Sequence, residues 1–338
     1  MTAVIPAGVT TARDLVQPAL AASLERLTPH VRRVAAYHLG LADAEGRPCQ
    51  AGGKALRPAL ALLSVRAAGS PAEHGIPAAV AVELVHNFSL LHDDIMDGDT
   101  ERRHRPTAWT VFGSPAAILA GDALLALAQD ILLEDGAPQG RWAARCLLAA
   151  VQRLIAGQGA DIEFERRSDV SMDECLTMAG DKTAALMACA SSIGAIFAGA
   201  PPALAMSLAD YGSHMGLAFQ LVDDLLGIWG APEVTGKPVW SDLRSRKKTL
   251  PVVAALEGTD PEAARQLGEL LGRESALSED DLELAAGLVE KGGGRAWAEE
   301  EAARQLETAL ACLDEGGVAD PVRDELTGIA RFITERTY

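Results

Sequence analysis

Apolar residues recur along most of the chain at the three- and four-residue spacing of amphipathic or buried α-helices. Near the start, Leu15, Leu20, Leu24 and Leu27 follow this spacing ahead of Pro29. Gly, Pro and short polar stretches divide the later apolar runs. The pattern predicts helices over 13–41, 54–69, 77–97, 114–134, 139–160, 171–182, 183–199, 203–229, 251–256, 261–271, 278–291, 295–314 and 320–336.

Several helix ends carry recognisable signals. Ser278 and Asp281 have the spacing of a capping box, and Gly292 is typical of a helix stop. The helix that begins near residue 139 is expected to end at Gly157–Gly159. We expect polar or charged loops over 42–53, 98–108 and 230–247, and flexible residues over 1–12.

No alternation of apolar and polar residues persists, and aromatic residues make up only 4% of the chain. We find no internal repeat and no low-complexity linker. These features predict an all-α protein of about a dozen helices around a central cavity, with residues 1–338 forming a single domain.

The chain is acidic, with a formal net charge of −17 over 338 residues. This charge argues against nucleic acid or an anionic membrane as a general partner. Five scattered cysteines without a CxxC pair favour free thiols in a reducing compartment. The N-terminal residues lack a basic region followed by an apolar run, so we expect no signal peptide and a cytoplasmic location.

One segment, Thr183–Ala209, contains no charged residue and is long enough to span a membrane. It is rich in Ala, Gly and Ser, and Pro201 and Pro202 interrupt it. We therefore expect a tightly packed core helix and no membrane span.

The candidate chemistry begins at the end of the helix predicted over 77–97, in the sequence HDDIMDGDTERRHRP. Asp93 and Asp97 lie one helical turn apart on one face, and Asp94 points away from that stripe. Two stacked carboxylates on an apolar helix need a counter-charge, which arginines or a divalent metal can supply. Oxygen ligands favour Mg²⁺. The alternative is an acidic helix end that faces solvent.

A second acidic pair, Asp223 and Asp224, follows an apolar run in FQLVDDLLG. We predict that the two acidic segments face each other across one cavity. Basic residues lie before, between and after them, at Lys54, Arg57, Lys182, Lys237 and Lys247. For Lys182 and Lys237, and for Arg102 after the first acidic segment, the alternative is a surface salt bridge.

Six motifs follow one another between about residues 50 and 252: GGKALRP, VELVHNFSLLHDDIMD with ERRHRPT, GQGAD, DKTAAL, FQLVDD and GKPVWSDLRSRKKTLP. In these motifs the chain resembles the trans-isoprenyl diphosphate synthases, the family of farnesyl and geranylgeranyl diphosphate synthases. The resemblance implies the isoprenoid synthase fold, a homodimer and three Mg²⁺ ions. It also implies that the allylic C–O bond of one diphosphate substrate ionises and that isopentenyl diphosphate captures the cation.

The resemblance also assigns roles to residues. It implies metal binding by Asp93, Asp97 and Asp223. The expected catalytic group comprises these three residues with Asp94, Lys182 and Lys237. Arg102, Lys182 and Lys237 match family positions that contact the allylic diphosphate. The expected metal-free pocket for isopentenyl diphosphate comprises Lys54, Arg57, His86 and Arg103. The other substrate-binding residues expected are Thr183, Gln220, Asp224, Asp242 and Lys247.

Product length is expected to depend on Val85, Phe88 and Ser89, which lie below the first aspartates. Val85 and Ser89 are modest in size, whereas Phe88 is bulky and stands five residues before Asp93. In the resembled family, a large aromatic here without one at the next position limits growth to medium chains. We predict geranylgeranyl diphosphate, with farnesyl diphosphate as the second choice. The alternative role for Phe88 is core packing.

Four positions depart from the family pattern. Gly227 stands where many members have the third aspartate of the second motif, and Asp242 is a candidate to orient metal-bound water. Trp240, His104 and Arg246 replace residues that are often Gly in the family. These departures bear on closure of the active site and on the choice of substrate.

Two further functions fit the same fold. A class I terpene cyclase carries an Asn/Asp–x–x–Ser/Thr–x–x–x–Glu motif, and this chain has Gly227 and Ala231 at the last two places counted from Asp224. A non-catalytic subunit of a heteromeric synthase would have lost aspartates from the first motif, yet Asp93 and Asp97 are present.

Overall fold

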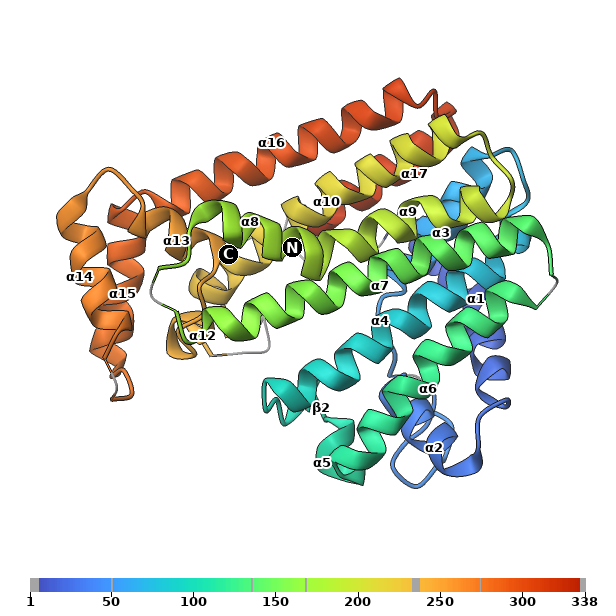
Figure 1. Cartoon of the computed structure of the whole chain (residues 1–338), viewed down its shortest axis with the longest axis horizontal. Coiled ribbons are helices and arrows are strands. Elements are labelled where there is room, and N and C mark those ends of the chain that lie inside the picture. Colours follow the sequence, from blue (N-terminus) through green and yellow to red (C-terminus); the bar gives the residue numbers. More distant parts are fainter. Residues whose placement is uncertain are drawn as a thin grey trace.

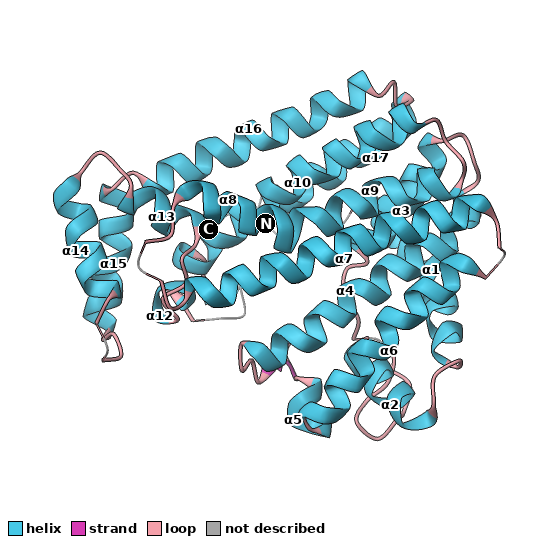
Figure 2. Cartoon of the chain, viewed as in Figure 1, coloured by secondary structure: helices cyan, strands magenta, loops and turns pink. Residues whose placement is uncertain are grey.

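The chain folds almost entirely into helices, as the apolar spacing predicts (Figure 2). The computed structural model describes residues 6–49, 51–134, 136–167, 169–232, 238–273 and 275–334. The α-helices are α1 (Ala7–Leu24), α2 (Pro29–His38), α3 (Leu56–Ala67), α4 (Ile76–Met96), α5 (Ala108–Phe112), α6 (Ser114–Leu133), α7 (Pro138–Phe164), α8 (Met172–Ala179), α9 (Ala185–Phe197), α10 (Pro202–Trp229), α12 (Ser241–Arg244), α13 (Leu250–Leu256), α14 (Pro261–Leu271), α15 (Glu279–Lys291), α16 (Gly294–Glu315) and α17 (Asp320–Thr334). A 3₁₀ turn, η1 (Ala72–Gly75), precedes α4, and a π-helical segment, η2 (Gly180–Ala184), joins α8 to α9.

Small residues let the central helices approach one another closely. α9 packs between α3, α7 and α10, and α16 runs along α10 (Figure 1). A side chain on Gly194 of α9 would begin 2.0 Å from the Ala61 carbonyl oxygen of α3. A side chain on Gly212 of α10 would begin 2.5 Å from the Met187 carbonyl oxygen of α9. The core helix predicted after Thr183 is therefore confirmed, and Pro202 begins the next helix.

The acidic segments lie toward one end of this bundle. α4, α7 and α10 all run with their C-terminal ends toward the left of Figure 1. This arrangement brings Asp93 of α4 and Asp223 of α10 to the same end of the molecule. The loops that follow these helices, and η2 between α8 and α9, complete that end.

Apolar side chains form three buried clusters. The largest lies among α1, α3, α4, α6, α7 and α9. A second fills the space between α13, α14 and α15, and a third joins α8, α10, α13 and α16. The capping box predicted at Ser278 and Asp281 is present at the start of α15, and Gly292 follows the last residue of that helix. The single-domain organisation stays a prediction.

Several expected helix boundaries are wrong. The helix expected over 13–41 is two helices, because α1 ends at Leu24 and Pro29 begins α2. The loop expected over 230–247 contains the short helix α12. α1 begins at Ala7, because Val9 and Ala12 are buried against the core and hold this segment in place. The flexibility expected over 1–12 therefore fails for 7–12, while 1–5 lie outside the described residues. α7 continues through Gly157–Gly159 to Phe164. Gly157 lies where α7 touches η2, so it serves a close helix contact and does not end the helix.

A short hairpin interrupts the otherwise helical chain. β1 (Glu101–Arg102) and β2 (Arg105–Pro106) pair in antiparallel register, Glu101 with Pro106 and Arg102 with Arg105. It falls within the charged loop expected over 98–108. Its two turn residues, Arg103 and His104, both have left-handed φ angles, of 53° and 59°.

α6 is the one helix in the described part of the chain that is long and apolar enough to cross a membrane, by length and composition alone. It packs along α4 and against α7, and 39% of its most apolar window is buried. Ile118 and Leu119 lie on its exposed side. The cytoplasmic location stays a prediction.

Candidate active site

In the first acidic motif, Asp93 and Asp97 lie near lysine side chains, whereas Asp94 is buried within the protein. Asp93 is partly buried, and this burial, opposed by Lys182 and reinforced by Asp97, raises its pKa to about 6. Asp97 ends α4, and its carboxylate lies 3.9 Å from the Lys247 ammonium. Asp94 is almost completely buried on the other side of the helix. Asp94 therefore lies off the stripe of Asp93 and Asp97, as the helix geometry predicts, and the stripe lies toward the lysines Lys182 and Lys247.

Asp94 holds the hairpin in place. Its Oδ1 accepts a hydrogen bond from Arg102 Nε at 2.6 Å, so Arg102 is anchored to α4. Tyr37 of α2 donates its hydroxyl to the Pro106 carbonyl at 2.8 Å and thereby anchors the other strand. The turn then projects Arg103 toward the glycine loop before α3. His104, a departure from the family pattern, adopts the left-handed conformation that explains why Gly is common there.

A basic cavity of about 500 Å³ lies between α3, α4 and this hairpin. Lys54, Arg57, His86 and Arg103 all line it, as the sequence predicts. A side chain on Gly53 would begin 2.7 Å from Arg103 Nη2, so Gly53 is needed for the guanidinium to lie there.

The histidine of this cavity is a neutral acceptor. Arg57 Nη1 donates to His86 Nε2 at 3.2 Å. Burial, with Arg57 and Arg103 nearby, keeps the pKa of His86 well below its usual range. Burial also lowers the pKa of Arg57 to about 10, an effect that Glu83 opposes, so its guanidinium stays charged at neutral pH.

Lys182 comes from the π-helical segment η2. Its ammonium pairs with Asp161 of α7, and the next residue, Thr183, donates its hydroxyl to Gln220 Oε1 at 2.6 Å. A side chain on Gly157 would begin 2.3 Å from the Lys182 amide nitrogen, so α7 and η2 are in direct backbone contact. π-helical segments are frequent at functional sites because they redirect one side chain.

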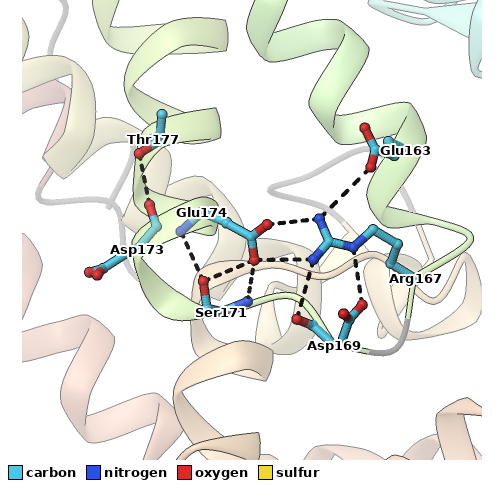
Figure 3. Close-up of polar contacts among 7 residues, drawn as sticks. All are labelled: Glu163, Arg167, Asp169, Ser171, Asp173, Glu174 and Thr177. Carbon is cyan, nitrogen blue, oxygen red and sulfur yellow. Dashed lines mark hydrogen bonds and ion pairs between the residues drawn. The ribbon is translucent and has the colours of Figure 1, made fainter.

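The turn that leads from α7 to α8 is fixed by one arginine. Figure 3 shows Arg167 contacting Asp169 and Glu174, with Nε 3.0 Å from Asp169 Oδ1 and Nη1 2.8 Å from Glu174 Oε1. Glu174 also completes the capping box of α8 with Ser171, so of the two starts that the sequence offers, Ser171 and Asp173, it is Ser171 that caps the helix, which begins at Met172. This network sets the direction of α8 and so of η2.

The adjacent aspartates of α10 differ in their exposure to solvent. Asp223 is exposed toward the cavity, whereas Asp224 is buried. Asp224 accepts hydrogen bonds from Gln220 Nε2 at 2.7 Å and from the Leu250 amide at 3.0 Å. Burial raises the pKa of Asp224 to about 8, and nearby Asp242 adds to this effect. Asp224 therefore ties α10 to the start of α13.

Two further cavities connect the acidic segments. One of about 330 Å³ is lined by Asp161, Lys182 and Asp223, among others. One of about 580 Å³ is lined by Asp97, Arg102 and Arg103. Both are lined by Asp242 and Lys247, so they adjoin. Although burial works against its charge, the carboxylates of Asp97, Asp161 and Asp242 raise the pKa of Lys247. Lys237 lies outside the described residues.

The predicted chain-length residues lie deeper along α4. Val85 is completely buried, and Ser89 donates its hydroxyl to the His86 carbonyl. Phe88 is 6% exposed and meets the His92 ring edge-on, with 4.9 Å between ring centroids. His92 in turn lies against Gly121 of α6. Phe88 therefore packs on the side of α4 that faces α6.

The carboxylates around these cavities fit a hard divalent cation. Asp93, Asp97 and Asp223 offer oxygen ligands from two helices. Burial, with Asp97 adding to it, raises the pKa of Asp93 and so disfavours its charged form, and a bound cation would offset this effect. Among the described residues, no three His, Cys, Asp or Glu side chains gather closely enough to hold an ion by themselves. Such a site suits Mg²⁺, which completes its shell with water and with phosphate oxygens.

Comparison with known proteins places this chain in a family. The sequence model described as polyprenyl synthetase matches residues 41–288. The (2E,6E)-farnesyl diphosphate synthase of Mycobacterium tuberculosis is 50% identical over 96% of this chain and 91% of its own length. The geranylgeranyl diphosphate synthase of the same organism is 44% identical over 94% and 90%.

A solved structure agrees with these relatives. The polyprenyl synthetase of Streptomyces coelicolor A3(2) superposes with a TM-score of 0.92 and 52% identity, covering 98% of this chain and 99% of its own. The chain belongs to the polyprenyl synthetase family and is a prenyltransferase with the all-α isoprenoid synthase fold.

Two residues of the site were missed from the sequence. Glu83 lines the basic cavity, where burial raises its pKa and Arg57 opposes that shift. Asp161 pairs with Lys182. Asp161 is the last residue of the motif GQGAD, and an acidic residue within a family motif could have indicated that it belongs to the site. Glu83 lies on the apolar helix three residues before His86, a spacing that places both on one face.

Proposed function

We propose that this enzyme condenses isopentenyl diphosphate with an allylic diphosphate and releases geranylgeranyl diphosphate. The observation that carries the proposal is the division of charge within one site. A basic cavity with Lys54, Arg57 and Arg103 adjoins, through Arg103, cavities that combine Asp97 and Asp223 with Lys182 and Lys247. One diphosphate can thus bind to cationic side chains in the basic cavity, and a second can bind through metal ions in the adjoining acidic cavities.

The basic cavity suits isopentenyl diphosphate, which must keep its diphosphate. The cationic side chains of the cavity bind the phosphate oxygens directly. Arg57 donates a hydrogen bond to neutral His86 and so fixes the position of the imidazole ring. Glu83 limits the excess positive charge there. The glycine loop permits close approach of a phosphate to the backbone.

The acidic cavities suit the allylic diphosphate, which must leave. Mg²⁺ held by Asp93, Asp97 and Asp223 supplies, when bound, charge stabilisation for the departing diphosphate. Lys182 and Lys247 add fixed positive charge beside these carboxylates, and Arg102 is held ready by Asp94. Thr183 and Gln220 orient one another behind Lys182. Three ions and Lys237 as a further contact are parts of the same proposal.

Farnesyl diphosphate is the second candidate product, because a farnesyl diphosphate synthase is 50% identical to this chain. We favour the longer product because Phe88 lacks an aromatic neighbour at residue 89 and no residue is inserted in the DDIMD motif. The named relatives are synthases, so the cyclase alternative receives no support from them.

The deciding experiment supplies labelled isopentenyl diphosphate and Mg²⁺ with dimethylallyl, geranyl or farnesyl diphosphate in turn. We expect geranylgeranyl diphosphate as the longest main product from each starter. Accumulation of farnesyl diphosphate, with farnesyl diphosphate itself refused as a starter, would contradict the assigned length. A hydrocarbon formed without incorporation of label would contradict the proposed reaction.

We also propose that the enzyme is a homodimer formed through α6 and α7. These helices pack against each other, and both expose large apolar side chains. Leu119 of α6 is 58% exposed, and Trp142 and Ile155 of α7 are 61% and 54% exposed. Large apolar side chains exposed on two neighbouring helices are typical of an obligate subunit interface, and we call these residues the α6–α7 face.

A further inference from the structure

Gly227 has no conformational need to be glycine. It lies inside α10, and its φ is not in the left-handed region. A glycine inside a helix costs about 1 kcal/mol of stability relative to alanine. The absence of a side chain at this position therefore has another physical reason.

That reason is the carboxylate of Asp242. A Cβ on Gly227 would lie 2.0 Å from Asp242 Oδ2 and 2.5 Å from its Cγ. A side chain at residue 227 would require the Asp242 carboxylate to move. The Asp242 carboxylate thus fills the place where a residue-227 side chain would begin.

The position of Asp242 is well supported. It belongs to the short helix α12, whose preceding residue Trp240 donates its amide to the Ile228 carbonyl at 3.3 Å. Ser241 donates its hydroxyl to the Gly227 carbonyl at 3.2 Å. The Lys247 amide donates to the Asp242 carbonyl at 2.9 Å and closes the segment behind it. Trp240 has a left-handed φ of 60°, so the chain turns sharply to present the next two residues to α10.

The location matters because residue 227 lies one helical turn after Asp223, on the same face of α10. Asp223 and Asp242 line one cavity together with Lys182. Asp242 also lines the adjoining cavity with Asp97. A carboxylate here lies between the two acidic helices.

We propose that Asp242 provides from α12 the second carboxylate of the α10 metal site, in place of an aspartate at residue 227. Asp223 and Asp242 together then hold the cation on the α10 side, directly or through its bound water. This inference rests on the proposed function, because it assigns a residue to the metal site of that reaction. It also explains why Gly227 and Asp242 occur together.

A reciprocal exchange tests the proposal. The variants are Asp242→Ala, Gly227→Asp and the double variant Gly227→Asp/Asp242→Ala, with Asp210→Ala as a control that removes an exposed carboxylate from α10. The readouts are the thermal midpoint without metal and, by calorimetry, the Mg²⁺ dependence of inorganic pyrophosphate binding.

We expect Asp242→Ala to weaken Mg²⁺-dependent pyrophosphate binding by about tenfold or more and to leave the thermal midpoint near that of wild type. Gly227→Asp is expected to lower the thermal midpoint, because its side chain collides with Asp242. The double variant is expected to recover both the midpoint and, to within about threefold, the affinity. Asp210→Ala is expected to behave as wild type.

Equal affinity of wild type and Asp242→Ala would overturn the proposal, as would a double variant no better than Asp242→Ala. Failure of the proposed function is a separate result. In that case wild type itself would show no Mg²⁺-dependent pyrophosphate binding and no prenyl transfer, whatever the thermal midpoints of the variants.

Discussion

In each of the two acidic pairs of this protein, the adjacent aspartates have different surroundings and different roles. Asp93 lies near Lys182 and Asp223 lines a cavity, whereas their neighbours Asp94 and Asp224 are buried and accept hydrogen bonds from Arg102, Gln220 and the Leu250 amide. The sequence grouped Asp94 with the catalytic residues and Asp224 with the substrate-binding residues. These contacts support positioning roles for both, because Asp94 fixes the hairpin and Asp224 fixes the chain after Lys247, and both segments carry cations that we propose to bind substrate.

Asp93→Asn tests the charge at the cavity. Because folding raises the pKa of Asp93 to about 6, the native state holds this proton more tightly than the unfolded state. Stability of the metal-free enzyme therefore falls as pH rises from about 4 to about 6. The stability of the variant should not fall over this pH range. Above pH 6 the variant should be more stable than wild type by about 1–3 kcal/mol.

The same variant should lower turnover by at least about 100-fold, since it removes a metal ligand. Urea unfolding at several pH values and a prenyl transfer assay check the two effects. A folded variant with normal turnover would contradict the metal assignment, and a pH-independent stability difference would contradict the burial argument.

Phe88→Ala tests the floor of the product cavity. If Phe88 limits elongation, the variant should make longer products from the same substrates. If Phe88 serves only to pack against His92 and α6, the product distribution should stay the same, while stability falls by about 3–5 kcal/mol. Chromatography of the dephosphorylated products, beside a thermal melt, separates the two roles. Val82→Ala is the matched control, because it opens a cavity in α4 at a buried residue outside the predicted chain-length set.

At the scale of elements, glycines decide how the helices meet. Gly157 was interpreted as the end of a helix, yet α7 passes through it and uses it to touch the backbone of η2. Helix spacing and turn propensity are local properties of the sequence. A glycine chosen for a contact with a distant segment has the same local pattern as a glycine that ends a helix, so the sequence predicts the wrong boundary here.

Gly157→Ala and Gly159→Ala form a matched pair on α7. A Cβ at residue 157 would lie 2.3 Å from the Lys182 amide nitrogen, whereas none of the surrounding atoms lies within 4 Å of one at residue 159. We expect Gly157→Ala to lose about 1–3 kcal/mol of stability and to lower turnover by displacing Lys182. Gly159→Ala should gain up to about 1 kcal/mol with unchanged turnover. Equal behaviour of the two variants in melts and assays would refute the contact.

At the scale of the whole molecule, the described surface contains one apolar face shared by two neighbouring helices, α6 and α7. Elsewhere exposed apolar side chains such as Leu284 of α15 stand apart from this face. The acidic net charge of −17 keeps copies apart in general, so association requires a specific apolar contact.

Leu119→Glu tests that contact. The variant should shift the enzyme from dimer toward monomer in sedimentation velocity, because it places a charge in the proposed interface. Leu284→Glu makes the same substitution at a similarly exposed leucine outside the face and should leave the mass unchanged. A wild-type monomer, or a Leu119→Glu variant that stays dimeric, would exclude this interface.

The sequence by itself determined the helical class, most helix positions, the family and the residue types of the site, because apolar periodicity and motif spacing are local and additive. Only the tertiary structure decided that Asp94 anchors the hairpin and Asp224 the start of α13, that Gly227 makes room for Asp242, and that Gly157 joins α7 to η2. These choices depend on atoms brought together from segments far apart in the chain, and no periodicity along one helix specifies which distant atom will meet it.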